Sequence, residues 1–236
     1  MKYVMSDLHG CYEEYKEALA LIHFSNEDEL YILGDVLDRG AGGIRILQDM
    51  MMRSNVIPIL GNHEYMAMTV LSRLSEEITE ETADHYLTVE DMTNYFHWTS
   101  DGGDCTVKAY RCLTREEQTD ILDYLAEFSL YEEVHVNGKD YILVHGGLEP
   151  FIPEKPLTEY ELSELIFRAP NYEQMYYENK YLVTGHRPTL SLNEKLLQGK
   201  ILKKNNHIAI DCGCVFGGNL AVYRLEDGKE WYIAKK

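Results

Sequence analysis

Five short polar clusters, each directly after a run of strand-forming residues, constrain this chain more than any other feature. Asp, His and Asn side chains are costly to desolvate unless something binds them. In an open α/β sheet, the carboxyl ends of the strands are also where ligands gather. Five clusters in the same position relative to their strands therefore predict one shared site. The clusters are Asp7-Leu8-His9-Gly10, residues 34–40 (Gly-Asp-Val-Leu-Asp-Arg-Gly), Gly61-Asn62-His63-Glu64, His145-Gly146-Gly147 and Gly185-His186.

The pattern of apolar residues predicts alternating strands and helices. Short apolar or aromatic runs bounded by Gly, Pro or Asn predict strands at 2–5, 30–33, 56–60, 140–144, 180–184 and 207–210. Helical periodicity predicts helices at 12–22, 44–52, 64–74, 115–128 and 159–167. Two of these are expected to begin with a capping box, Thr114 with Glu117 and Thr158 with Glu161. Asp227-Gly228, inside the tail 219–236, predicts a closing hairpin, and the alternation as a whole indicates an α/β fold.

The chain length is suited to a single unit. For 236 residues we expect one domain over 1–236, with a cap insertion around 75–104. The segment 75–91 carries seven acidic residues and little apolar periodicity, so we interpret it as part of a cap beside the site. A solvated helical face is the alternative. The segment 149–156 contains three prolines and predicts a loop after His145.

Charge and cysteine content exclude several classes of partner. The formal charge of -18 argues against nucleic acid and against an anionic membrane surface. Five cysteines without a C-x-x-C spacing indicate neither a disulfide framework nor a zinc knuckle, so we expect a reducing cytoplasmic location. No apolar run approaches the ~18 residues of a membrane span. Asp7 and His9 also fall where a signal peptide would need an apolar segment.

The residue types in the clusters suit a pair of divalent metal ions. Two ions about 3.5–4 Å apart can polarise a phosphoryl group, hold it for in-line attack and supply a hydroxide near neutral pH. Imidazole, carboxylate and amide oxygens together favour Mn, Fe or Zn, and we expect Mn to support activity in vitro. Asp35 is the expected bridging carboxylate. The other expected ligands are Asp7 and His9 for one ion, and Asn62, His145 and His186 for the second.

In this order, the clusters resemble those of the calcineurin-like metallophosphoesterase superfamily. Within it they are most similar to the phosphoprotein phosphatase family, especially its bacterial and phage serine/threonine members. The likeness runs from residue 3 to about residue 225 and includes Asp101-Gly102-Gly103-x-x-Thr106 and Asp211-x-Gly213-x-Val215-Phe216-Gly217-Gly218. It implies a four-layer α/β/β/α sandwich of two mixed β-sheets flanked by helices, with the metal ligands given above.

The resemblance also implies roles for residues beside the metals. Arg39, Arg168 and Asn62 would bind the substrate phosphate. His63, oriented by Asp38, would protonate the leaving oxygen. An alkoxide is a poor leaving group, so a positioned imidazolium contributes about 10² to 10⁴ in rate. A carboxylate partner fixes the tautomer of that imidazole.

Three functions remain open. We favour a serine/threonine phosphatase-type phosphomonoesterase, which would use a metal-bridging hydroxide to attack a phosphoprotein or small phosphoester. The second is a symmetrical hydrolase of dinucleoside polyphosphates such as diadenosine tetraphosphate (Ap4A), which requires a base-stacking pocket. The third is a non-catalytic, metal-dependent binding protein. Its signature would be the loss of His63, Asp38 or a metal ligand, and all of these residues are present.

Overall fold

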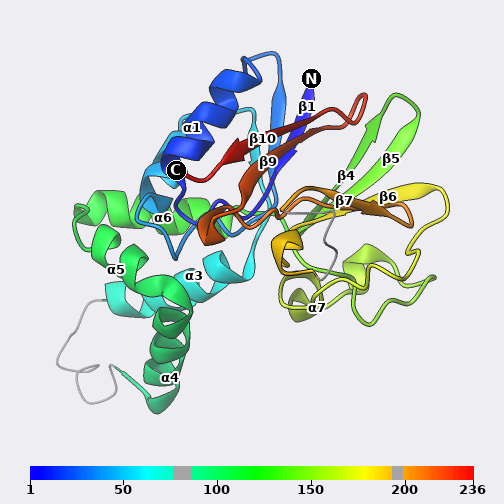
Figure 1. Cartoon of the computed structure of the whole chain (residues 1–236). Coiled ribbons are helices and arrows are strands. Elements are labelled where there is room, and N and C mark those ends of the chain that lie inside the picture. Colours follow the sequence, from blue (N-terminus) through cyan, green and yellow to red (C-terminus); the bar gives the residue numbers. More distant parts are fainter. Residues whose placement is uncertain (77–86, 193–198) are drawn as a thin grey trace.

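The computed structural model describes residues 1–76, 87–192 and 199–236, and it contains two five-stranded sheets side by side (Figure 1). The first sheet has the order β10 (Glu230–Ala234), β9 (Asn219–Arg224), β1 (Lys2–Met5), β2 (Glu29–Ile32) and β3 (Val56–Pro58). The second has the order β4 (Tyr131–Val136), β5 (Lys139–Val144), β6 (Lys180–Thr184), β8 (His207–Ala209) and β7 (Leu202–Lys204). β1, β2 and β3 run parallel in the first sheet, as do β5, β6 and β8 in the second, and the other pairs of neighbouring strands are antiparallel.

The two sheets share an apolar layer. Because successive side chains of a strand point to opposite faces, Tyr141 and Leu143 of β5 join Val4 of β1 in this layer. Ile142 of β5 and Met5 of β1 belong instead to the larger core on the outer faces. β1 and β5 therefore bury apolar side chains on both faces, at about 1.5–3 kcal/mol for each large side chain removed from water.

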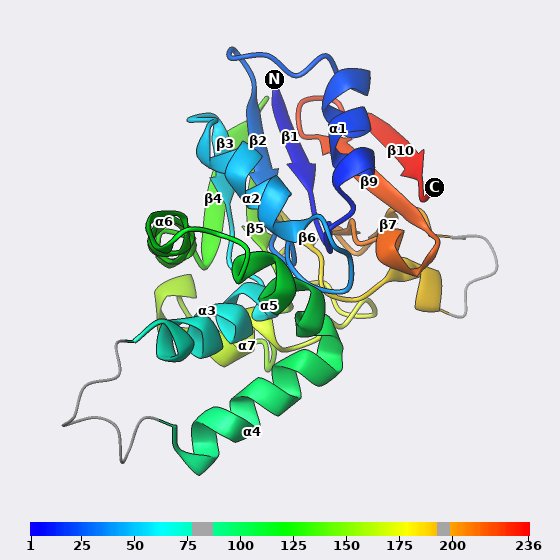
Figure 2. The same ribbon diagram turned by 90° about the vertical axis from the view of Figure 1, so that its left-hand side faces the viewer.

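Helices cover the outer face of the first sheet (Figure 2). They are α1 (Tyr12–Leu21), α2 (Gly43–Met51) and α6 (Arg115–Ala126). The outer face of the second sheet is covered by the chain around the short helix α7 (Leu162–Ile166), whose Leu165 and Ile166 are buried. The order helix, sheet, sheet, helix confirms the expected four-layer sandwich of two mixed sheets.

Three further helices form an arm below the first sheet (Figures 1 and 2). They are α3 (Asn62–Ser75), α4 (Val89–Trp98) and α5 (Asp104–Tyr110), with a π-helical turn at Thr99–Gly103 between the last two. Within that turn Gly102 has φ +106°, and a Cβ there would lie 2.7 Å from Arg39 Cγ, so this position requires glycine. The expected cap insertion remains a prediction, because residues 77–86 of it lie outside the described residues.

The sequence located most elements to within two residues. The hairpin at 219–236 and the capping box of Thr114 with Glu117 are confirmed. The second capping box was wrong: it joins Glu161 to Glu164, so α7 begins at 162, and Leu157–Glu159 forms a 3₁₀ turn. The sequence analysis also missed α4, α5, β4 and β7. In the described part of the chain, no helix has the length and apolar character needed to cross a membrane.

Candidate metal centre

Four of the six expected metal ligands lie on tight turns after strands, where the backbone is held in an unusual conformation. A left-handed backbone is costly for residues other than glycine and persists only where surrounding contacts fix it. Here the turn after β1 is bonded to the turn after β2, since the N–H groups of Asp7 and His9 donate to the carbonyls of Gly34 (3.1 Å) and Asp35 (2.8 Å). Six site residues have φ between 40° and 70°: Asp7, His9, Asp35, Asp38, Arg39 and His186.

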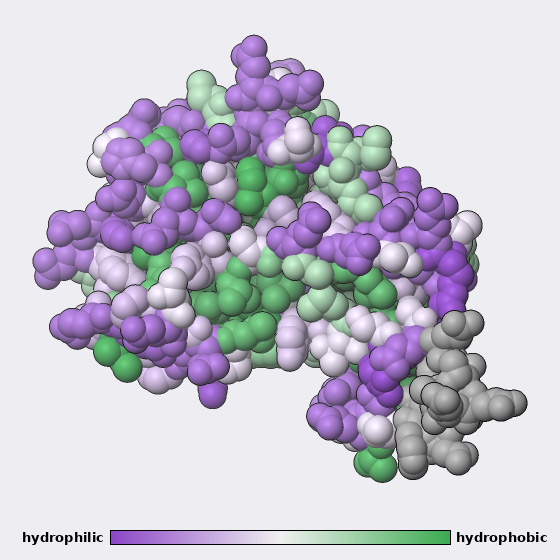
Figure 3. Space-filling model, turned by 180° about the vertical axis from the view of Figure 1, so that it is seen from behind, coloured by the Kyte–Doolittle hydropathy of each residue, from purple (hydrophilic) through white to green (hydrophobic). Residues whose placement is uncertain are grey.

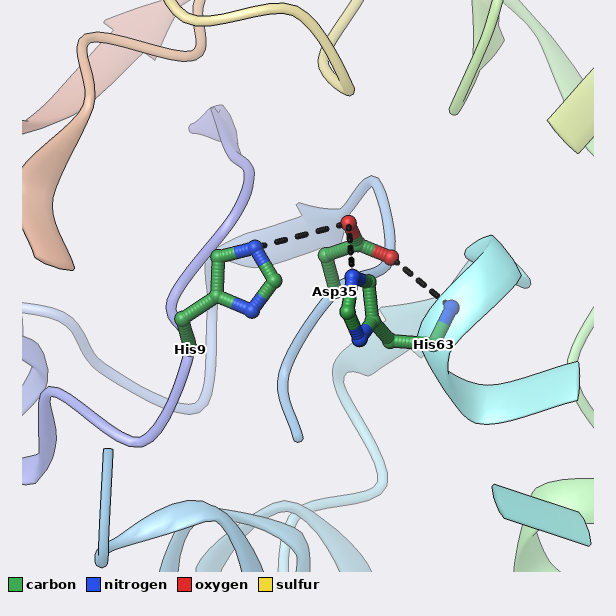
Figure 4. Close-up of side chains that lie close together, drawn as sticks. All are labelled: His9, Asp35 and His63. Atoms are coloured by element: carbon green, nitrogen blue, oxygen red, sulfur yellow. Dashed lines mark hydrogen bonds and ion pairs between the residues drawn. The ribbon is translucent and has the colours of Figure 1, made fainter. Parts of the chain in front are cut away.

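Asp35 stands at the centre of the cluster (Figure 4). Its Oδ2 lies 3.5 Å from His9 Nε2 and 3.9 Å from His63 Nε2, and its Oδ1 accepts the His63 backbone N–H at 3.2 Å. On the other side, Oδ1 lies 3.3 Å from His145 Nε2. Among the residues that the structure describes, two groups of side chains are close enough to hold an ion, His9 with Asp35 and His63, and Asp35 with His145 and His186. A carboxylate common to both groups has the position of a bridging ligand.

The second group consists of acceptor atoms that face one another. His145 Nδ1 donates to the Leu33 carbonyl at 2.6 Å, which leaves a lone pair on Nε2. That lone pair faces Asn62 Oδ1 at 3.0 Å and His186 Nδ1 at 3.2 Å, and the last two atoms lie 2.9 Å apart. Burial lowers the pKa of His145 well below its usual value and that of His186 to about 4, so both rings stay neutral. Neutral imidazoles and an amide oxygen converging on a carboxylate fit a divalent metal ion.

Asp7 lies beside these groups rather than within them. Its Oδ2 accepts the backbone N–H of His186 at 3.0 Å and also the Ser6 hydroxyl. Burial, and then the neighbouring carboxylate of Asp211, raise the pKa of Asp7 well above its usual value. The turn leaves no room for a side chain at Gly185, where a Cβ would lie 2.3 Å from Asp7 Oδ2. Two neighbouring buried carboxylates are stabilised by a bound cation.

His63 and Asp38 form the expected pair at the edge of the cluster. His63 Nδ1 donates to Asp38 Oδ2 at 2.7 Å, and the two side chains are 1% and 0% exposed. Asp38 also accepts from Trp98 Nε1 at 2.6 Å and from Thr106 Oγ1 at 2.5 Å. The carboxylate therefore fixes the imidazole with its Nε2 towards Asp35, as Figure 4 shows.

The two arginines differ in how directly they reach the site. Arg39 Nη1 lies 2.5 Å from His9 Nε2, and Nη2 donates to Asp101 at 3.0 Å. Its guanidinium therefore uses the lone pair that a metal on His9 would take, and metal binding has to release this bond. The backbone carbonyl of Arg168 accepts a hydrogen bond from the Gly147 N–H, in the turn after His145, at 2.6 Å. The side chain of Arg168 is exposed. The phosphate-binding roles of both arginines remain predictions.

Several residues of the site were not identified as functional from the sequence. Glu64 is fully buried and accepts the N–H groups of residues 35 and 36 at 2.7 and 2.8 Å, and those of residues 37 and 61 at 3.0 and 3.2 Å. The capping-box spacing from Gly61 to Glu64 is the signal that could have shown it. Thr106 and Asp211 lie in two of the recognised motifs. Trp98 lies in none, so nothing in the sequence indicates its bond to Asp38.

Fold and site together define a class of protein, the two-metal phosphoesterases. The chain belongs to the calcineurin-like phosphoesterase family, whose model matches residues 3–223. This family uses a binuclear metal centre, and the His and Asp cluster is suited to one. The expected superfamily is thereby confirmed, whereas the finer assignment to bacterial serine/threonine phosphatases remains a prediction.

Two relatives in sequence are named as nucleotide hydrolases. The symmetrical bis(5'-nucleosyl)-tetraphosphatase of Nitrosospira multiformis is 26% identical over an alignment of 260 positions, gaps included. The alignment covers 96% of this chain and 93% of the relative. The asymmetrical bis(5'-nucleosyl)-tetraphosphatase of Oceanobacillus iheyensis is 22% identical, in an alignment that covers 99% of this chain and 92% of the relative. Both similarities extend over nearly the whole of each chain.

Solved structures of several activities share the fold. A candidate diadenosine tetraphosphatase superimposes with a TM-score of 0.69 at 16% identity, covering 100% of this chain and 93% of its own. A cold-active protein-tyrosine phosphatase from Shewanella gives a TM-score of 0.56 at 16% identity, covering 98% of this chain and 79% of its own. At these identities the likeness establishes the fold and leaves the substrate open.

Proposed function

We propose that this protein hydrolyses dinucleoside polyphosphates, with Ap4A cleaved symmetrically to two ADP molecules. The observation that carries the proposal is the similarity to a symmetrical bis(5'-nucleosyl)-tetraphosphatase over 96% of this chain. This reverses the preference drawn from the sequence, in which a serine/threonine phosphatase-type phosphomonoesterase came first. The substrate class is accordingly a phosphoanhydride between two nucleotides.

The proposed chemistry begins with the metal ligands. A bound pair of divalent ions would polarise the phosphoryl group and lower the pKa of water to near neutrality. Burial keeps the ligand imidazoles neutral, so their lone pairs are available at physiological pH. Asp35 is proposed as the shared ligand. The remaining proposed ligands are Asp7 and His9 on one side, and Asn62, His145 and His186 on the other.

His63 is proposed as the proton donor to the leaving phosphate oxygen. Asp38 accepts its Nδ1–H at 2.7 Å, so the proton to be transferred is carried at Nε2, which faces the cluster. Arg39 is proposed to exchange its bond with His9 for the negatively charged oxygens of the substrate. A charged hydrogen bond of this kind suits a guanidinium, whose planar donors match a phosphate.

A direct comparison of substrates tests this proposal. The protein is stripped of metal, supplied with Mn²⁺, and incubated separately with Ap4A and with a phosphothreonine peptide. We expect faster turnover of Ap4A, with ADP as the product. ATP and AMP as products would indicate asymmetrical cleavage, and turnover of the peptide alone would restore the phosphatase hypothesis. Bound metal without turnover of either substrate would support the binding protein.

A further inference from the structure

A groove lies along α3, between α4 and the residue that follows α7. Its volume is about 400 Å³, which is in the range of small-molecule sites, about 300–1,000 Å³. In Figure 3 the molecule is hollowed between the projecting part at the lower right, which carries α4, and the rest of the surface. The groove is thus a separate feature beside the metal centre and is large enough for one ring system.

Three aromatic rings from different elements line this groove. Tyr65 belongs to α3, His97 to α4, and Phe167 follows α7. The rings of Tyr65 and Phe167 meet edge to face, with centroids 6.0 Å apart and an interplanar angle of 89°. Phe167 is 40% exposed, so part of its ring is available to a ligand. Rings placed in this way form a platform on which a planar group can stack.

Polar side chains border the same groove. Asn94 and Glu90 of α4 and Thr69 of α3 contribute an amide, a carboxylate and a hydroxyl. The Thr69 hydroxyl donates to the Tyr65 carbonyl at 2.8 Å and keeps its acceptor lone pairs. Such groups can bind the donors and acceptors on the edge of a nucleobase. Glu90 in the groove wall and the net charge of -18 would both repel an anion, so the groove is better suited to a neutral nucleobase.

The groove begins close to the proposed proton donor. Asn62 and His63 occupy the first turn of α3, and at 1.5 Å per residue Tyr65 lies about 4.5 Å and Thr69 about 10 Å further along the helix. On the opposite wall, the chain around Phe167 is bonded to the turn after His145, since Gly146 N–H donates to the Leu165 carbonyl at 2.8 Å and Gly147 N–H to the Arg168 carbonyl at 2.6 Å. The groove therefore adjoins the metal centre on both walls, on the side of the proposed proton donor.

We propose that this groove binds the nucleobase of the departing nucleotide, stacked against Phe167 with its edge towards Asn94. The inference rests on the proposed function. In Ap4A, water attacks one central phosphorus and the bond from that phosphorus to the bridging oxygen breaks. The bond pair stays on that oxygen, which takes the proton of His63 and leaves as ADP over α3. The second ADP carries the oxygen of the water, and the proton that the water loses replaces the one that His63 gave up, so the atoms of Ap4A and one water are conserved.

The test compares Phe167→Ala with Phe96→Ala as a matched control, because Phe96 is 58% exposed on α4 and does not line the groove. The kinetics of each variant are measured with Ap4A and with inorganic tetraphosphate, which has phosphoanhydride bonds but no bases. We expect Phe167→Ala to lower kcat/KM for Ap4A by between about fivefold and a hundredfold, mainly through KM. Turnover of tetraphosphate, and both activities of Phe96→Ala, should remain within about twofold of wild type.

The outcomes separate this inference from the proposed function. Wild-type protein that cleaves tetraphosphate and leaves Ap4A intact would refute the proposed function. Wild type active on Ap4A, with Phe167→Ala equal to Phe96→Ala, would refute the groove alone. An equal loss on both substrates would mean that Phe167 supports the metal centre and would also refute it. Asn94→Ala, on the other wall, provides an independent variant and should lower kcat/KM for Ap4A several-fold, with tetraphosphate unaffected.

Discussion

The metal centre and the groove on α3 are neighbours built in opposite ways. In the centre, side chains are buried on turns after strands, and backbone hydrogen bonds between the turns hold left-handed residues in place. In the groove, exposed and half-exposed side chains project from α3, from α4 and from the residue after α7. A change in the centre disturbs ligands that depend on one another, whereas a change in the groove alters one contact with the substrate. We therefore expect chemistry and substrate choice to respond separately to mutation.

Asp35→Asn should have the largest effect, because Asp35 belongs to both metal groups. Loss of its charge weakens both sites at once, and even changes around metal ligands lower affinity about 10- to 100-fold. We expect depleted metal and loss of turnover. Metal analysis of the purified protein measures this, with Asp120→Asn on the exposed face of α6 as the control. An unchanged metal content would refute the bridging role and weaken the contrast between the two regions.

His63→Asn should have the next largest effect and separates proton transfer from metal binding. The variant should retain both metals and lose at least about a hundredfold in turnover of substrates with poor leaving groups. Phosphate release and metal content are measured on the same preparation. His23→Asn, at an exposed position with φ +53° that Asn tolerates, is the matched control. Full activity of His63→Asn would exclude it as the proton donor.

A third prediction concerns His207, which lies on β8, outside both the metal centre and the groove. It asks whether burial alone, without the metal cluster, lowers the pKa of a histidine. Burial lowers the pKa of His207 to about 4, whereas in the unfolded chain it is near 6.5. As the pH falls, the unfolded state binds the proton first, so the free energy of unfolding should fall by about 2 kcal/mol from pH 7 to pH 5 through this residue. His207→Gln should reduce that fall, as measured by urea unfolding of metal-stripped protein at both pH values. An identical pH dependence in the two proteins would contradict this assignment.

Trp98→Phe should have the smallest effect and tests whether the arm supports the centre. The substitution keeps an aromatic ring and removes the N–H that donates to Asp38 at 2.6 Å. Hydrogen bonds to charged groups contribute about 1.5–3 kcal/mol. The lower end of that range corresponds to a rate about tenfold lower, which is the loss of turnover that we expect. Trp231→Phe on β10 is the control.

The same substitution made together with His63→Asn shows how Trp98 acts. If the indole works through Asp38 and His63, Trp98→Phe should cause no further loss in the His63→Asn background. Independent, multiplicative losses would mean that Trp98 affects turnover by another route. Metal content should match wild type in the single Trp98→Phe variant, since Asp38 is not among the proposed ligands.

The sequence could place the expected ligands near one another, because each of them follows its own strand or opens the helix after it. Parallel strands bring their carboxyl ends to one edge of each sheet, which groups the residues after β1 and β2 and, separately, those after β5 and β6. The two sheets pack against each other, and the two groups then meet, as in the contacts of Asp35 with His145 and of Asp7 with His186. Asp7 and His186 are far apart in the chain, yet each could be placed from its own strand. The alternating apolar runs that define those strands were visible in the sequence.

The arm and the groove were harder to predict because they depend on packing between helices. In α4, Val89 is 85% and Phe96 58% exposed and only Trp98 is buried, so the helix has no continuous apolar face for the sequence to reveal. The groove needs Phe167 to meet Tyr65, and no spacing along the chain predicts that contact. The start of α7 was misplaced because both Thr158 and Glu161 are followed three residues later by a glutamate.

The buried carboxylate of Glu64 determines which parts of this molecule are able to move. It joins the turn after β2 to the start of α3 through four backbone N–H groups, so Asp35, Asn62 and His63 are held as one rigid body. Any motion that admits substrate or releases product must then come from elements outside this body. α4 is one of these elements, and the indole N–H of its single buried side chain, Trp98, donates to Asp38. We expect α4 to swing about Trp98 while the metal ligands stay fixed.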